Sequence, residues 1–501
     1  MSTQTKLMTN WRWWICALLF VATTVNYLDR QVLSLTYEEF IKPQFHWTDA
    51  NYGTITSFFS IFYAICCLFA GKFVDWMGTK RGYLIAIGVW SAGAVMHAAC
   101  GWATVHLVSG VDSVAALKAV EAGSNVALAV STTSVFLFLL CRGILALGES
   151  GNFPAAIKVT AEYFPKKDRA FATSIFNAGA SVGALAAPLL IPPLAVKFGW
   201  EMAFIIIGGL GFIWMFFWVF MYDKPEKSKR VNKAELEYIH QDDASLEAEA
   251  SSSASLRDPV RENAPEEASA SKEKAIPFIQ CFKYRQTWSF IAGKFFTDGV
   301  WWFFLFWAPS YFSNQFKAPA TSPLGQWLIF TLYAIVTVIS IGGGYLPKLF
   351  VEKKGMHPYS GRMLAMLIFA FFPIAALFAQ PLGVSFNSPW WPAILIGLAG
   401  AGHQAWSANL FSTVGDMFPK STIATITGIG AMAGGIGSMI IQKVAGNLFT
   451  FAENQGAAFR FLGFEGKPAG YFIMFCFCGL AYLVAWIIMK SLVPKYKPVE
   501  E

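Results

Sequence analysis

Charged residues interrupt two long apolar stretches of this chain. Asp29 and Arg30 lie within the apolar run 13–35. Arg142 and Glu149 lie in a second apolar segment further along, seven positions apart and so on one face of a helix. At about 1.5 Å per residue, such a run can cross the roughly 30 Å hydrocarbon core of a bilayer. A charge at the centre of a membrane helix costs about 2.5–3.5 kcal/mol, which predicts a function for these residues: binding an anion and coupling its movement to protons.

Each of the four charges suits one part of that chemistry. A guanidinium stays charged and holds a carboxylate with two parallel hydrogen bonds, so we expect Arg30 to bind the substrate anion. Burial raises a carboxyl pKa and a nearby arginine lowers it, which makes Asp29 and Glu149 candidate proton sites. Arg142 either modulates Glu149 or helps to hold the anion. The alternatives are structural: Arg30 pairs with Asp29 or another helix, and Arg142 supports its own helix.

Uncharged polar residues add candidate contacts to a substrate. Tyr27 and Tyr63 are placed to line a cavity, although a membrane tyrosine can also be a packing residue. Asn152 follows Glu149 and precedes Pro154, where a broken helix could expose backbone to a cavity.

A third polar group lies in the apolar span 389–418. Its members are His403, Gln404, Ser407 and Asn409. Amides both donate and accept hydrogen bonds, so Gln404 and Asn409 suit sugar hydroxyls, and His403 is either a further contact or a packing residue. Trp302, with Trp301 and Trp406, could stack on the apolar face of a sugar.

The composition is that of a membrane protein. Hydrophobic residues make up 55% of the chain and charged residues only 14%, well below the quarter typical of soluble domains. The net charge of +7 comes from basic loops and is read as an orientation signal, so no nucleic-acid partner is expected. The 8 cysteines have no metal-ligand spacing, and no catalytic constellation is present. We expect no metal, no cofactor and no enzymatic activity.

Counting apolar runs predicts twelve membrane-spanning helices. They are 12–35, 50–73, 82–103, 133–158, 169–193, 202–222, 286–312, 326–351, 362–380, 389–418, 421–449 and 468–491. The polar stretch 223–285 is rich in Glu, Ala and Ser and predicts a linker, with a short surface helix possible at 233–240. The expected domains are therefore an N-terminal six-helix bundle (1–222), the linker (223–285) and a C-terminal six-helix bundle (286–501).

Basic residues predict the orientation. They concentrate in the linker and in the even-to-odd loops, for example at Lys80, Lys166 and Lys353. By the positive-inside rule the linker and both termini face the cytoplasm, and the loop 101–125 lies outside. The expected location is the inner cell membrane, with the lipid bilayer as a partner.

The two parts of the chain repeat a loop pattern, which leads to a family. After the second span comes Gly-Lys-Phe-Val-Asp75-Trp-Met-Gly-Thr-Lys-Arg81, and a Gly-bounded basic loop follows the eighth span. The first loop resembles the signature of the major facilitator superfamily. This resemblance implies an all-α membrane fold of two six-helix bundles, in which Asp75 and Arg81 belong to a conformational latch.

Further motifs are similar to the anion:cation symporter group and its bacterial hexuronate transporters. They are Asn-Tyr-Leu-Asp-Arg at 26–30, Arg-Gly-Ile-Leu-Ala-Leu-Gly-Glu at 142–149, Thr-Asp-Gly-Val-Trp-Trp at 297–302 and His-Gln-Ala-Trp-Ser-Ala-Asn at 403–409. The resemblance implies proton-coupled import of glucuronate or galacturonate by alternating access, with Asp29 and Glu149 as proton sites and Tyr63 contacting the substrate. We expect a monomer. The alternatives are a symporter of an aldonate or dicarboxylate and a transporter-like sensor that does not transport.

Overall fold

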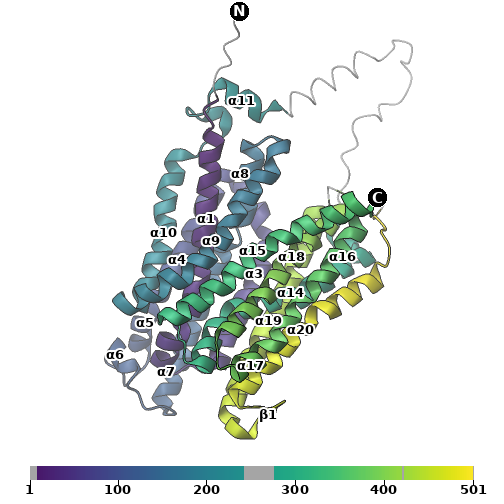
Figure 1. Ribbon diagram of the computed structural model, residues 1–501. Helices are drawn as coiled ribbons and strands as arrows, with labels where there is room; N and C mark the ends of the chain where they lie inside the picture. Colours follow the sequence, from purple (N-terminus) through teal and green to yellow (C-terminus); the bar gives the residue numbers. More distant parts are fainter. Residues whose placement is uncertain (1–7, 242–275, 420–421, 500–501) are drawn as a thin grey trace, which may run out of the picture.

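The computed structural model describes residues 8–241, 276–419 and 422–499, so most of the linker, 242–275, lies outside the described residues. These residues are almost entirely helical (Figure 1). The elements up to the linker are α1 (Trp11–Thr36), η1 (Tyr37–Ile41), α2 (Lys42–Phe45), α3 (Asp49–Met77), α4 (Thr79–Met96), η2 (His97–Ala99), α5 (Cys100–Leu107), α6 (Val114–Leu117), α7 (Asn125–Glu149), α8 (Asn152–Tyr163), α9 (Lys166–Phe198), α10 (Trp200–Met221), η3 (Pro225–Lys227) and α11 (Lys233–Ile239).

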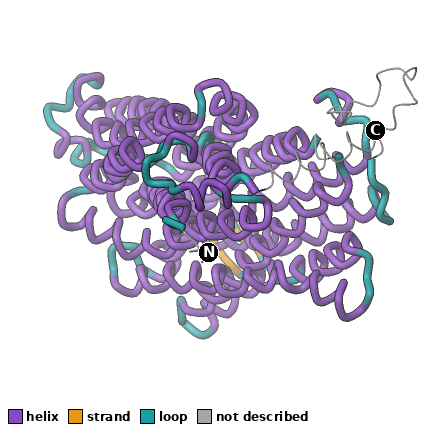
Figure 2. The backbone as a smooth tube through the Cα atoms, turned by 90° about the horizontal axis from the view of Figure 1, so that it is seen from above, coloured by secondary structure: helices purple, strands orange, loops and turns teal. Residues whose placement is uncertain are grey.

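The remaining elements follow the linker. They are α13 (Phe278–Cys281), α14 (Arg285–Phe316), α15 (Pro323–Lys354), α16 (Pro358–Ala370), η4 (Phe372–Ile374), α17 (Ala375–Ser385), α18 (Trp390–Met417), α19 (Ile423–Gln455), η5 (Gly456–Ala458), β1 (Arg460–Phe461), β2 (Phe464–Glu465) and α20 (Lys467–Leu492). The two short strands pair antiparallel in a tight hairpin, and helices fill the rest of the view from above (Figure 2).

Nine helical segments of the described chain are long and apolar enough to cross a membrane. The three other expected spans correspond to α1, α14 and α18, which have 26, 32 and 28 residues. These three helices have the length of a span and carry Asp29, Asp298 and His403 among their polar residues. The expected all-α membrane architecture is confirmed, and the helix count agrees with twelve spans.

Boundaries differ from expectation where helices continue past the apolar run. The fourth expected span began at residue 133, but α7 starts at Asn125, where Ser124 accepts a hydrogen bond from Ala127 as an N-terminal cap. The third expected span ended at residue 103, whereas α5 continues to Leu107. The short helix α11 forms where the sequence allowed one. It is anchored by Glu235, whose carboxylate lies 3.0 Å from the guanidinium of Arg12.

The long helices pack in two groups, which we call the N-terminal half (α1 to α11) and the C-terminal half (α13 to α20). Contacts within the first include α1 with α9 and α4 with α7, and contacts within the second include α14 with α20 and α15 with α18. The halves meet through α3 against α19, α9 against α15 and α1 against α14. We name the two ends of the molecule after α11 and α6, which lie at opposite ends (Figure 1).

Glycines allow the closest contact between the halves. A Cβ atom at Gly53 of α3 would lie 2.7 Å from the carbonyl oxygen of Gln442 and 2.9 Å from the Cα of Gly446, both on α19. One at Gly435 would lie 2.2 Å from the Cβ of Ala64. These distances are shorter than carbon contacts permit, so α3 and α19 lie this close only because these positions carry no side chain.

Polar contacts join the halves at the α6 end. The Lys467 ammonium lies 2.7 Å from the Asp49 carboxylate, and both side chains are buried. Ser310 donates to Glu38 at 2.7 Å, and Ser313 donates to Glu39 at 2.8 Å. The buried ion pair matters most, because removing one member leaves the other as a poorly compensated charge. The α6 end is therefore closed by charge as well as by packing.

Replacing Lys467 with Met tests this closure. Among the described residues, the Asp49 carboxylate then keeps Lys42, at 3.0 Å, as its one cationic partner. We expect amide hydrogen exchange in η1 and the first turn of α3 to accelerate by about tenfold or more, because the buried charge favours opening. Hydrogen-exchange mass spectrometry of the purified protein measures this effect.

The control is Arg460→Met, which breaks an exposed ion pair to Glu465 on the neighbouring β1–β2 hairpin. Exposed pairs contribute little, so exchange in η1 and α3 should match the wild type. Equal exchange in Lys467→Met and the wild type would show that the ion pair does not hold this end closed.

Candidate substrate and proton site

The Arg30 side chain forms the centre of the site. It is buried, and its Nε and one terminal nitrogen donate to the same oxygen of Glu149, Oε2, at 3.1 and 2.6 Å. Of the alternatives open for Arg30, the structure thus realises a partner on another helix, rather than the adjacent Asp29. The other Glu149 oxygen, Oε1, has no hydrogen-bond partner among the described residues.

The local fold brings Glu149 to this position. It is the last residue of α7, and α8 starts three residues later at Asn152, so the helix breaks at the expected place. A Cβ atom at Gly148 would lie 2.3 Å from the backbone nitrogen of Trp90, and one at Gly151 would lie 2.8 Å from the Cβ of Ala86. Both neighbours belong to α4, so these two glycines let the break lie tightly against that helix.

Glycines also position the helix that carries Arg30. A Cβ atom at Gly179 of α9 would lie 2.4 Å from the carbonyl oxygen of Phe20, and one at Gly183 would lie 2.6 Å from that of Thr24. Helix α1 therefore packs directly on the backbone of α9. This contact fixes the face of α1 that bears Arg30 toward α3 and α14.

Aromatic rings surround the Arg30 guanidinium. Its central carbon lies 5.2 Å from the ring of Tyr27, 4.9 Å from Tyr63 and 5.1 Å from Trp302. The ring of Phe59 is 5.7 Å away. Rings within about 6 Å of a cation attract it through their negative faces. Three helices contribute, and Trp302 on α14 brings the C-terminal half into the site.

Two further charges are buried in the N-terminal half. Asp29 is 2% exposed, and neither of its oxygens has a hydrogen-bond partner in the described part of the chain. Arg142 lies with its guanidinium 5.5 Å from the ring of Phe59, and its Nε also lacks a partner in that part of the chain. Phe59 thus contacts both arginines. Buried charges without partners are costly, which is typical of residues kept for function.

The other expected residues are distributed more widely. Asn152 is fully buried and accepts a hydrogen bond from the Tyr83 hydroxyl at 2.8 Å. His403 bonds to the Tyr482 hydroxyl at 2.7 Å and stacks on Trp301, with the two rings 5.6 Å apart. These contacts make His403 a packing residue of the C-terminal half, and Asn152 lies one helix turn beyond the ion pair.

The amides of α18 divide into two roles. Asn409 donates to the carbonyl oxygens of Gly343 and Ala405, both at 2.8 Å, so its nitrogen holds α18 against α15. Gln404 is only half-buried. The expected latch residues lie on the α11 side of the N-terminal half: Asp75 forms an ion pair of 2.7 Å with Lys158, and Arg81 is exposed.

Sequence reasoning missed two residues that belong to this site. Phe59 contacts Arg30 and Arg142, and its position one helical turn before Tyr63 was the available signal. Asn26 is 1% exposed, and both atoms of its amide lack partners among the residues described. It precedes Arg30 by four positions and so shares its helix face.

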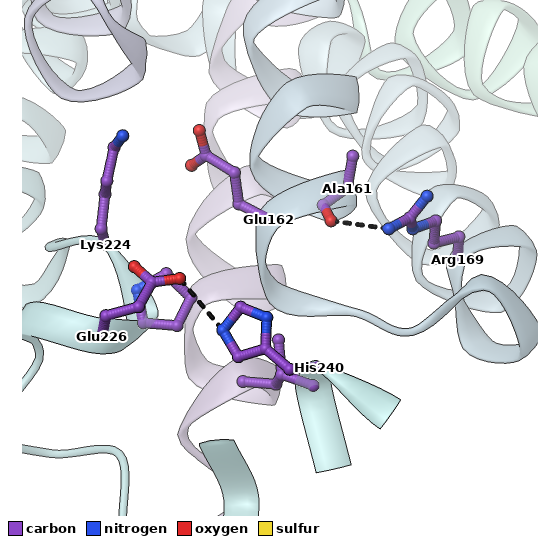
Figure 3. A pocket seen from close by; sticks show the side chains of 8 residues that line it. Ala161, Glu162, Arg169, Lys224, Glu226 and His240 are labelled. Carbon is purple, nitrogen blue, oxygen red and sulfur yellow. Dashed lines mark hydrogen bonds and ion pairs between the residues drawn. The ribbon is translucent and has the colours of Figure 1, made fainter. Parts of the chain in front are cut away.

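A separate pocket of about 350 Å³ lies at the α11 end, between α8, α9, η3 and α11 (Figure 3). Three of its charged groups have partners: His240 lies 3.0 Å from Glu226, and Arg169 donates to the carbonyl oxygen of Ala161. Glu162, which also lines this pocket, lies in the last turn of α8. Glu149 lies before the first turn of α8, at the opposite end of that helix. The pocket is therefore not part of the Arg30 site.

Sequence and structure comparisons show which known proteins this chain resembles. The hexuronate transporter of Escherichia coli (strain K12) is 26% identical over 438 residues, covering 87% of each chain. The galacturonate transporter of Dickeya chrysanthemi is 25% identical over 381 residues, covering 74% of this chain and 92% of that one. A crystal structure of a bacterial homolog to human lysosomal transporter Spinster, inward-facing and unoccupied, covers all of both chains with a TM-score of 0.66 and 17% identity, and so supports the fold alone.

A sequence model of the Major Facilitator Superfamily matches residues 19–441, most of the chain. This confirms the family expected from the loop at 71–81 and from the apolar spans. It also confirms the expectation of a transporter instead of an enzyme, since the family consists of membrane transporters and the curated relatives are transporters. The chain belongs to the Major Facilitator Superfamily, as a multi-pass membrane transporter.

Proposed function

We propose that this chain is a proton-coupled symporter that imports an anionic sugar acid, specifically a hexuronate such as glucuronate or galacturonate. The observation that carries the proposal is the buried Arg30–Glu149 ion pair inside a ring of aromatic side chains. A substrate carboxylate and Glu149 are chemically equivalent partners for the guanidinium. They therefore compete for Arg30, and protonation of Glu149 decides which of them is bound.

The proposed cycle links one proton event to one substrate event. A proton on Glu149 removes the charge that holds Arg30, and the guanidinium then donates two hydrogen bonds to the substrate carboxylate. When the proton leaves, Glu149 takes Arg30 back and the sugar acid is released. Asp29, buried without a hydrogen-bond partner among the described residues, is the second proton site. Arg142 lies beside the same aromatic ring as Arg30 and supports the anion.

The rings and amides suit a sugar. The faces of Tyr27, Tyr63 and Trp302 can pack on the C–H groups of a pyranose while Arg30 holds its carboxylate. The half-buried amide of Gln404 can exchange hydrogen bonds with hydroxyl groups. The relatives named above as hexuronate and galacturonate transporters support the same substrate class.

The orientation completes the proposal. Lys158 belongs to α8, Arg169 to the start of α9, and Arg230 precedes α11. By the positive-inside rule we take the α11 end to face the cytoplasm together with both termini. The α6 end then faces outward across the inner membrane, so the outer end is closed here. Asp75 and Arg81 act as the cytoplasmic latch. The two six-helix bundles, 1–222 and 286–501, are joined by the linker 223–285 and rock about the Arg30 site in a monomer.

Replacement of Arg30 tests the substrate site. We expect Arg30→Ala to abolish uptake of labelled glucuronate into proteoliposomes under an inward proton gradient. Arg30→Lys should lower kcat/KM by about tenfold or more, because an ammonium keeps the charge but loses the paired hydrogen bonds. Arg460→Ala removes an exposed arginine at the α6 end and serves as the control with unchanged uptake. Normal glucuronate uptake by Arg30→Ala would refute the assignment.

Replacement of the acids tests the coupling. Asp29→Asn and Glu149→Gln cannot change their protonation, so each should lose accumulation driven by the proton gradient and keep some exchange of internal for external substrate. The measurement is uptake with the gradient on and off, followed by counterflow in preloaded vesicles. A sodium gradient without a proton gradient is the control and should drive nothing. Gradient-driven accumulation that survives both substitutions contradicts the proposed coupling.

A further inference from the structure

Another buried ion pair lies within the C-terminal half, outside the cluster around Arg30. The Lys294 ammonium lies 2.6 Å from Oδ2 of Asp298, four residues further along α14. The side chains are 8% and 16% exposed, so the pair is largely buried but can still be reached. Burying two hydrophobic residues of similar size would cost less free energy than burying this ion pair, so a role for the pair in binding a polar ligand explains why it is present.

The exposure pattern of α14 shows which way this pair faces. Ile291, Phe295, Asp298 and Trp302 are half-buried, while most positions between them are buried. Their spacing of four, three and four residues forms one stripe along the helix. The Trp302 ring lies 5.1 Å from the Arg30 guanidinium, so this stripe faces the Arg30 site. Asp298 is one turn away from Trp302, about 6 Å along the axis.

Two other helices complete the surroundings of the pair. On α18, Gln404 and Ser407 are half-buried and Phe411 is exposed, and the Phe411 ring lies 4.6 Å from the Lys294 nitrogen. On α19, a Cβ atom at Gly434 would lie 2.2 Å from Oδ2 of Asp298. The glycine leaves room for the carboxylate, and α18 carries the amide and the aromatic ring.

We propose that Lys294 and Asp298 form the subsite for the end of the sugar acid that lies opposite the carboxylate held by Arg30. The proposal rests on the proposed function. Asp298 lies one helix turn, about 6 Å along the axis, from Trp302, whose ring lies 5.1 Å from the Arg30 guanidinium, so a sugar ring that packs on Trp302 extends from Arg30 toward the pair. Lys294 donates a hydrogen bond to an oxygen at the end of the sugar opposite its carboxylate. Asp298 accepts a hydrogen bond from a hydroxyl group at the same end, because an ammonium can only donate and a carboxylate can only accept.

The charge balance of the subsite sets its specificity. The pair has no net charge, so it receives the neutral, hydroxylated end of a hexuronate. A hexarate carries a second carboxylate at this end, which meets Asp298 as a like charge as well as Lys294. Removing either charge should therefore shift the preference between the two classes in opposite directions, because specificity is a difference between two affinities.

The test is competition between the two classes in proteoliposomes. Uptake of labelled glucuronate is inhibited with unlabelled glucuronate or glucarate, and the ratio of their inhibition constants is the readout. In Asp298→Asn the lysine is uncompensated, and we expect the ratio to shift toward glucarate by about tenfold. In Lys294→Met the carboxylate stands alone, and the ratio should shift away from glucarate.

Two controls separate binding from folding. Lys294→Asp combined with Asp298→Lys keeps the subsite neutral and should return the ratio toward that of the wild type. Glu352→Gln breaks an exposed pair of the same spacing with Lys348 on α15 and should leave the ratio unchanged. If Asp298→Asn does not fold, Lys294→Met and the exchanged pair still give the ratio.

The outcomes distinguish this inference from the proposed function. A wild type that takes up glucuronate with the proton gradient, together with a ratio that is equal in all variants, overturns the subsite and leaves the proposed function intact. A wild type that takes up no sugar acid overturns both. Opposite shifts in the two single variants support the subsite.

Discussion

A charge that must stay inside an apolar structure governs this molecule. Arg30 lies in the apolar interior, and its guanidinium needs a partner there because it has no access to bulk water. Glu149 supplies that partner from another helix, and it is the last residue of α7, directly before the break that separates α7 from α8. Glycines allow α7 to pack closely on α4 and α9 to pack closely on α1, and this packing places the two members of the ion pair beside each other.

The same requirement recurs in the contacts that hold the halves together. Asp49 and Lys467 are both buried at the α6 end. Helix α14 contacts this end through Ser310 and contacts the Arg30 guanidinium through Trp302. The helix that helps to close one end is thus the helix that contacts the site. In the proposed transport cycle, this one helix connects the substrate site with the contacts that close the α6 end.

The sequence predicted the elements well and the partners less well. The apolar runs identified the helices, and a spacing of four residues is enough to bring Lys294 and Asp298 together because both lie on one helix. The pairing of Glu149 with Arg30 depends on how α1 packs against the break after α7, which no local pattern encodes. For the same reason Asn409 looked available to a substrate, although α15 occupies its nitrogen. Asp49 and Lys467 are so far apart in sequence that only the assembled fold brings them together.

Pro309 lies within α14, between the residues that contact the α6 end and the residues that contact Arg30. Its ring cannot donate the backbone hydrogen bond to the carbonyl of Leu305, so the helix is least stiff at this turn. The Ser310 contact at the α6 end and the Trp302 contact with Arg30 therefore lie on opposite sides of a turn that lacks one helical hydrogen bond. In the proposed transporter, opening of the α6 end and binding of the substrate beside Trp302 can then be separate steps, although both involve the same helix.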